Sequence, residues 1–101
     1  MNPVRVQLHV RTVEEGGRHG PIATGYRAGC WIEPIDPDIG GNDGIITVEG
    51  ADLIAPGSDG IASIHFLHPE LVQHKLRPGS SFDIREGRLR VVATAVVLSP
   101  Q

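Results

Sequence analysis

The segment with the clearest capacity for chemistry covers residues 14–27 and reads EEGGRHGPIATGYR. Its adjacent Gly16 and Gly17 allow backbone conformations that side chains forbid, which indicates a shaped loop. Arg18 and His19 follow directly, and connecting segments run over the surface, where a partner can reach them. Because a guanidinium group binds phosphate or carboxylate oxygens in a two-pronged geometry, the loop is a candidate anion-binding site. The simpler interpretation is a glycine turn beside a solvated arginine.

Side chains capable of covalent or metal chemistry occur without the spacing that such chemistry needs. The chain contains no G-x-x-x-x-G-K-[ST] motif, so it cannot hydrolyse GTP alone, and we expect no nucleotide. Cys30 lies near the centre of an expected strand without a basic neighbour, which favours a core residue over a nucleophile. Asp36 and Asp38 lack the frame of a calcium loop, and His65 and His68 fall on opposite faces of a strand. We therefore expect no enzyme activity, no catalytic residue, no metal and no cofactor.

Charge is unevenly distributed along the sequence. The formal net charge is -3, which argues against a general nucleic-acid binder. Residues 33–59 hold seven of the twelve acids and no Lys or Arg, so the remainder of the chain has a basic excess. Segregation of this kind predicts a polarised surface that would bind an acidic partner on one side. In a barrel, however, distant strands become neighbours, and the separation need not persist in space.

Alternation of apolar and polar residues predicts an all-β chain. Residues 4–10 show the period-two pattern of a half-buried strand, and residues 12–13 are expected to extend it. Five further strands are expected at residues 26–32, 45–48, 61–67, 79–84 and 88–98, with a single helical turn within residues 71–77. The run VVATAVV in the last strand indicates burial on more than one side or a bulge. Such strands form an antiparallel sandwich or a closed barrel, and pairing of the first strand with the last would close it.

Composition places bounds on the setting of the protein. The 101 residues suffice for one domain with a modest core. No run approaches the roughly 18 apolar residues of a membrane span, and Arg5 and His9 interrupt any signal-peptide pattern. A single cysteine excludes an internal disulfide and is consistent with a reducing compartment. We expect a cytoplasmic protein with no membrane contact.

Four short motifs occur in order along the chain. They are EEGGRH followed by GYR, then PGSD at residues 56–59, FLHP at residues 66–69 and FDIREG at residues 82–87. With these motifs the chain resembles the C-terminal β-barrel, the third domain, of translation elongation factor Tu over nearly its whole length, without the GTPase domain. The resemblance implies a six-stranded antiparallel closed β-barrel, and we predict this fold for a single domain over residues 1–101.

In that family the barrel holds the backbone of the acceptor and T stems of aminoacyl-tRNA and contacts the GTPase domain and the exchange factor. The resemblance implies that the RNA-binding residues here are Gly17, Arg18, His19, Arg85, Gly87 and Arg88. The chain departs from the family at Gly20, at residues 22–23 and 28–30, in REGR where REGGR is expected, and in a longer connection from His68 to Phe82. Several of these departures fall near the RNA-facing and interdomain surfaces.

Two functions follow as hypotheses. In the first, the chain is a binding module that contacts RNA, a tRNA acceptor arm in particular, and Arg18, His19, Arg85 and Arg88 clamp backbone phosphates. In the second, it is a protein-interaction module that mimics the elongation factor barrel to bind a GTPase, an exchange factor or a toxin, and the acidic segment steers a basic partner. A barrel whose ancestral surface is no longer used is the simplest alternative. Trp31 either marks a partner surface or fills a packing layer.

Overall fold

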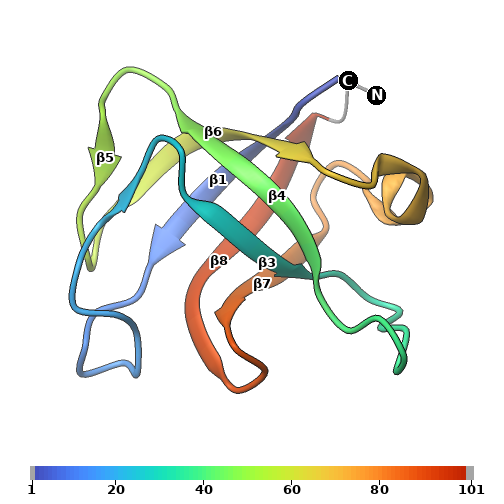
Figure 1. Ribbon diagram of the computed structural model, residues 1–101. Coiled ribbons are helices and arrows are strands. Elements are labelled where there is room, and N and C mark those ends of the chain that lie inside the picture. Colours follow the sequence, from blue (N-terminus) through green and yellow to red (C-terminus); the bar gives the residue numbers. More distant parts are fainter. Residues whose placement is uncertain (1, 100–101) are drawn as a thin grey trace.

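Eight strands and two short 3₁₀ helices make up the fold in the computed structural model, which describes residues 2–99 (Figure 1). In chain order they are β1 (Val4–Val10), β2 (Ile22–Ala23), β3 (Arg27–Trp31), β4 (Asn42–Val48), β5 (Leu53–Ile54), β6 (Asp59–Phe66), η1 (Pro69–Leu71), η2 (Gln73–Lys75), β7 (Ser81–Glu86) and β8 (Arg90–Ser99). Six of the strands close into a barrel in the order β1-β6-β4-β3-β7-β8, and β2 pairs with β5 in a separate ribbon. All neighbouring strands are antiparallel, and β1 pairs with β8. The predicted six-stranded antiparallel closed β-barrel is confirmed.

Strict alternation in β1 shows how the strands build a common core. Val4, Val6, Leu8 and Val10 point inward and are fully buried, whereas the residues between them face outward. Because successive side chains of a strand point to opposite faces, this register assigns every apolar residue of β1 to the barrel interior. The same arrangement leaves the outer faces of the strands available to charged side chains.

Alternation fails in β8 because the strand contains a bulge. Ile84 of β7 pairs with Ala93, but Arg85 pairs with Val91, so Val92 is an extra residue on β8. Val92 and Ala93 are consecutive and both buried. A bulge bends a strand and increases its twist, which helps a barrel to close. Of the two alternatives that the VVATAVV run left open, burial on more than one side or a bulge, the structure shows the bulge.

Some strand bounds differ from those expected. Residues 12–13 do not extend β1, because they begin a turn in which the amides of Glu15 and Gly17 donate to the carbonyl of Thr12 at 3.1 and 2.9 Å. Conversely, β4 begins at Asn42 rather than at residue 45, since Asn42 already pairs with Cys30 of β3. The β2–β5 ribbon was not expected, because two-residue strands are too short to show an alternating pattern.

The β7–β8 hairpin is also shifted from its expected position. Arg85 and Glu86 belong to β7, and the turn covers residues 87–89 instead of residues 85–87. Between β6 and β7 the chain forms η1 and η2, two 3₁₀ turns beginning at Pro69 in place of the single helical turn expected in residues 71–77. The described residues contain no helix of the length and apolarity needed to cross a membrane.

Candidate binding site

Arg18 and Glu86 join the two motif segments at one end of the barrel. Arg18 Nε lies 3.0 Å from Glu86 Oε2. The hydroxyl of Tyr26, which is 60 residues from Glu86 in the sequence, donates a hydrogen bond to the same oxygen at 2.7 Å. The Arg18 guanidinium group also lies over the Tyr26 ring, 5.2 Å from its centroid, and donates to the carbonyl of Pro21. The loop that contains GGRH is thus held against the β7–β8 hairpin that contains REGR.

Tyr26 remains a hydrogen-bond donor because its environment disfavours ionisation. Burial raises the pKa of the Tyr26 hydroxyl, and the hydrogen bond to the Glu86 carboxylate raises it further, while the positive charge of Arg18 acts in the opposite direction. At neutral pH the phenol is therefore protonated and can donate to Glu86. Glu86 therefore forms an ion pair with Arg18 and accepts a hydrogen bond from the Tyr26 hydroxyl.

Gly17 serves packing within the loop. A Cβ added to Gly17 would lie 2.7 Å from the carbonyl oxygen of Arg11, a separation that real Cβ atoms do not reach. The Gly17 amide already donates to the Thr12 carbonyl at 2.9 Å, so it is not available to a phosphate. Glu15 completes the turn by accepting hydrogen bonds from the amide and hydroxyl of Thr12 at 2.9 and 3.2 Å. These hydrogen bonds, the one from the amide above all, lower the pKa of the Glu15 carboxyl.

The Arg85 side chain connects parts of the β7–β8 hairpin to one another and to Trp31. Its Nη1 donates to the carbonyl of Arg88 at 2.9 Å, and its Nη2 lies 3.2 Å from Asp83 Oδ2. Its Nε is buried and has no hydrogen-bond partner among residues 2–99. The guanidinium group stacks over the Trp31 ring, 4.6 Å from the centroid. Gly87 has a φ of +69°, the left-handed conformation that glycine adopts without a steric penalty and that lets the chain turn here.

Arg88 differs from Arg18 and Arg85 in having no acidic partner. Its guanidinium group lies over Trp31, 5.7 Å from the ring centroid. Within the part of the chain that the structure describes, no carboxylate oxygen lies within 4.0 Å of it. Arg88 is exposed and thus free to bind an anion from outside the protein.

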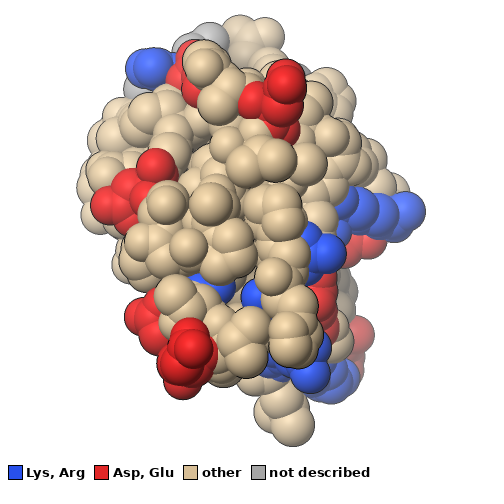
Figure 2. Space-filling view, turned by 90° about the vertical axis from the view of Figure 1, so that its left-hand side faces the viewer, with Lys and Arg blue, Asp and Glu red and all other residues tan. Residues whose placement is uncertain are grey.

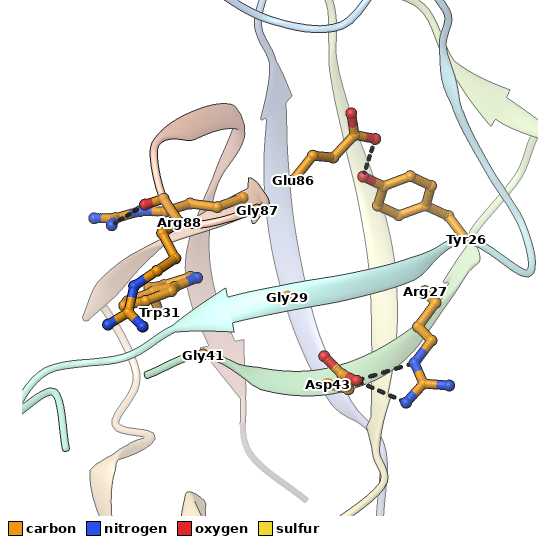
Figure 3. Close-up of a pocket in the computed structure, with 10 residues that line it drawn as sticks. Tyr26, Arg27, Gly29, Trp31, Gly41, Asp43, Glu86, Gly87 and Arg88 are labelled. Carbon is orange, nitrogen blue, oxygen red and sulfur yellow. Dashed lines mark hydrogen bonds and ion pairs between the residues drawn. The ribbon is translucent and has the colours of Figure 1, made fainter. Parts of the chain in front are cut away.

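A pocket of about 410 Å³ opens beside this cluster (Figure 3). Its lining residues are Tyr26, Arg27, Gly29, Trp31, Gly41, Asp43, Arg85, Glu86, Gly87 and Arg88. They come from β3, β4 and the β7–β8 hairpin, which are neighbours in the barrel. On its far side from Arg88, Arg27 donates hydrogen bonds to Asp43 Oδ2 at 3.0 and 2.7 Å.

Two carboxylates of the acidic segment over residues 33–59 pair with arginines from outside the segment. Asp43 pairs with Arg27 at 2.7 Å and Glu49 pairs with Arg5 at 2.9 Å. Figure 2, which views the barrel from the side of β5, shows acidic side chains at several separate places and most of the basic ones toward the lower right. Cross-strand pairing therefore mixes charges that are segregated in the sequence.

The structure gathers some of the six RNA-binding residues expected from the resemblance and separates others. Arg85, Gly87 and Arg88 line the pocket. Arg18 does not line it but forms an ion pair with Glu86, which does. Gly17 is buried in the loop, and His19 is exposed but does not line the pocket.

Seven of the ten pocket residues were not among the six predicted RNA-binding residues, and four of these seven have side chains that form hydrogen bonds in the structure. Tyr26 and Arg27 belong to the GYR motif, which supports the family resemblance but did not predict a role for either side chain. Glu86 lies within REGR, in which only the glycine and the two arginines were predicted to bind RNA. Asp43 gave no signal, because its contact with Arg27 depends on the β3–β4 register.

The groups capable of other chemistry are not arranged for it. Among residues 2–99, no three His, Cys, Asp or Glu side chains are grouped so that they could hold a metal ion. Cys30 is buried in β3, and burial raises the pKa of its thiol, so the reactive thiolate is disfavoured. The site therefore offers hydrogen bonding, stacking and charge rather than a nucleophile.

Comparison of the chain with models of known protein families gives no match. The class of protein that fold and site define is thus a small closed β-barrel with an arginine-rich pocket at one end.

Proposed function

We propose that the protein is a non-catalytic binding module that contacts the backbone of RNA, in particular a tRNA acceptor arm, through its GGRH and REGR loops. The observation that carries this proposal is the contact between the two loops, since Arg18 Nε lies 3.0 Å from Glu86 Oε2. Motif segments far apart in the chain are thereby placed on one surface, as a backbone clamp requires. The resemblance to the elongation factor barrel supports the same choice of partner.

The arginines have different roles in this proposal. Arg88 is the main phosphate ligand because it has no acidic partner among the described residues. Arg85 holds the hairpin carbonyl and the Trp31 ring, and Arg18 joins the loop to the hairpin. Backbone contacts of this kind recognise the shape and charge of RNA rather than its sequence.

Binding to a hairpin RNA with the shape of a tRNA acceptor arm tests the proposal. We expect saturable binding at low salt, and removal of one phosphate contact in Arg88→Ala should weaken it about tenfold or more. The slope of log K against log salt should become shallower by about 0.7–0.9 in this variant. Arg77→Ala is the matched control, because Arg77 is an exposed arginine that precedes β7, at the end of that strand away from the hairpin. Absence of detectable binding between the wild-type protein and the hairpin RNA at low salt would overturn the proposal.

A protein-interaction module is the second candidate, and Leu89 is the observation in its favour. Leu89 stands at the tip of the β7–β8 hairpin with 94% of its surface exposed, between Arg88 and Arg90. An exposed apolar side chain flanked by two arginines suits an apolar cleft with an acidic rim on a GTPase, an exchange factor or a toxin. Leu89→Ser should abolish co-purification of one stoichiometric protein and leave RNA binding unchanged. Recovery of RNA alone with the wild-type protein would count against this candidate.

A further inference from the structure

The pocket beside Trp31 has features that a clamp for a duplex backbone does not need. One is a rigid aromatic wall. A Cβ added to Gly41 would lie 2.7 Å from Trp31 Nε1, and one added to Gly40 would lie 2.9 Å from Trp31 Cη2. The backbone at these two glycines therefore packs directly against the indole ring and fixes its position.

Two stacked cations complete this wall. The guanidinium groups of Arg85 and Arg88 lie over the Trp31 ring at 4.6 and 5.7 Å from its centroid. Planar guanidinium groups stack on aromatic rings, and they also serve as stacking surfaces for nucleobases. Because Arg85 is engaged by Asp83 and by the Arg88 carbonyl, Arg88 is the cation that can accept a ligand.

The charge of the pocket fits a monoanion. Three arginines (Arg27, Arg85 and Arg88) and two acids (Asp43 and Glu86) line it, and both acids are already engaged, Asp43 by Arg27 and Glu86 by Arg18 and Tyr26. Arg85 is paired with Asp83, so among the described residues that line the pocket Arg88 alone carries an unbalanced positive charge. One phosphodiester group carries the single negative charge that would balance Arg88.

The wall opposite Arg88 offers donors and acceptors together. Arg27 directs both of its hydrogen bonds with Asp43 to the same oxygen, Oδ2, at 3.0 and 2.7 Å. The remaining Arg27 nitrogen is a donor, and the other Asp43 oxygen is an acceptor. The edge of a nucleobase carries both kinds of group, whereas a carboxylate or a lone phosphate needs donors only.

We infer that this pocket binds a single unpaired nucleotide, with its phosphate on Arg88 and the edge of its base toward Arg27 and Asp43. Its volume of about 410 Å³ lies within the range of roughly 300–1,000 Å³ that small-ligand pockets occupy. Bases within a duplex are stacked and paired, so only a single-stranded end or a free mononucleotide can enter. For a nucleotide at the end of an RNA, the inference rests on the proposed RNA-binding function and extends it from the duplex to its overhang.

Fluorescence of Trp31 gives a direct measurement, because it is the only tryptophan in the chain. The probes are a single-stranded trinucleotide, a nucleoside monophosphate, inorganic phosphate and a blunt-ended RNA duplex. We expect the trinucleotide to change the emission saturably, with at least tenfold weaker binding in Arg88→Ala and in Asp43→Asn and wild-type binding in Arg77→Ala. Saturation by the monophosphate at equal affinity would identify a free nucleotide as the source of the ligand.

Three other results would overturn the inference in different ways. If phosphate binds as tightly as the trinucleotide, the pocket recognises an anion without a base. If the duplex binds in an Arg88-dependent manner while neither the trinucleotide nor the monophosphate changes Trp31 emission, the backbone contact stands and the nucleotide pocket fails. Absence of binding by the trinucleotide, the monophosphate and the duplex would overturn the pocket and the proposed function together.

Discussion

The loop over residues 16–21 and the turn over residues 87–89 lie at the same end of the barrel, and each carries arginine beside glycine. They differ in how far their polar groups are already used. Arg18 of the loop forms an ion pair with Glu86 at 3.0 Å, whereas Arg88 of the turn has no such partner within the described part of the chain.

The glycines of the two segments show the same contrast. Gly17 is buried beneath Arg11 and its amide is already hydrogen-bonded, but a Cβ added to Gly87 would meet no atom within 4 Å. Similar local sequences thus have different purposes here. The loop acts as an internal clamp for the barrel end, and the turn leaves Arg88 exposed without an acidic partner among the described residues.

Substitution of Gly17 should have the largest effect on stability if the loop is a clamp. Gly17→Ala places a Cβ 2.7 Å from a backbone oxygen, and forced repacking of this kind costs about 1–3 kcal/mol. Urea denaturation should show a lower midpoint with an unchanged slope. Gly20→Ala is the matched control, because its Cβ would lie 3.7 Å from Arg18 Nη1, an ordinary contact. Equal stability of the two variants would contradict the clamp.

Removal of the Tyr26 hydroxyl should have the next largest effect. Tyr26→Phe deletes the 2.7 Å hydrogen bond to Glu86, and the expected loss in the free energy of unfolding is about 0.5–1.5 kcal/mol. Because Tyr26 is the only tyrosine, its ionisation can be followed by ultraviolet absorbance. The phenolate should appear above its ordinary pKa of 10.0 in the folded wild-type protein.

Glu86→Gln sharpens this test by removing the charge while keeping the shape. Burial still raises the pKa of Tyr26 in this variant but the Glu86 charge no longer does, so the phenolate should appear at lower pH than in the wild-type protein. The sign for stability follows directly. A raised pKa in the folded state means that the stabilisation is complete below pH 10 and is lost as pH rises above it. An unchanged titration in Glu86→Gln would mean that the carboxylate does not act on Tyr26.

The two arginines should separate stability from binding. Arg18→Ala should cost up to about 1 kcal/mol, because its ion pair with Glu86 is partly exposed. Arg88→Ala should change the free energy of unfolding by less than about 0.5 kcal/mol and still weaken RNA binding more than Arg18→Ala does. Parallel thermal unfolding and binding titrations measure both quantities. A destabilised Arg88→Ala would remove the distinction between loop and turn.

The smallest expected effect concerns Glu15 in the loop. Hydrogen bonds from Thr12 lower the pKa of this carboxyl below 4.5, so its contribution to stability is present above pH 4.5 and is lost as pH falls below that value. The melting temperature of the wild-type protein should therefore fall more steeply on acidification than that of Glu15→Gln. If the melting temperatures of the two proteins fall equally on acidification, the Glu15 carboxylate does not stabilise the turn.

Much of the fold could be predicted from the sequence because alternation is local information. Residues 4–10 alternate without error, and in the structure every apolar member is buried. The β2–β5 ribbon could not be predicted in this way, since Ile22 and Ala23 have too few neighbours to form a pattern. The bulge near Val92 could be predicted only as one of two alternatives, because an unbroken apolar run conflicts with alternation but is also typical of a strand buried on both sides.

The site was less predictable, because its contacts join distant strands. The motifs drew attention to Arg18 and Arg88, but nothing local indicates that one is neutralised by Glu86 and the other is not. The buried state of Gly17 likewise depends on the approach of the Arg11 backbone. The sequence does not decide whether Trp31 serves packing or partner contact. The structure places it against Gly41 on the wall of a pocket.

The order of strands in the barrel has a consequence for synthesis on the ribosome. β1 lies between β6 and β8, so the first strand of the barrel pairs only with strands made much later. Until β8 is complete, β1 and β7 each keep one unpaired side. Pairing between distant segments also makes folding slow, because a long loop must close before the contacts form. The unfinished barrel therefore remains open to proteases and chaperones until β8 has been made.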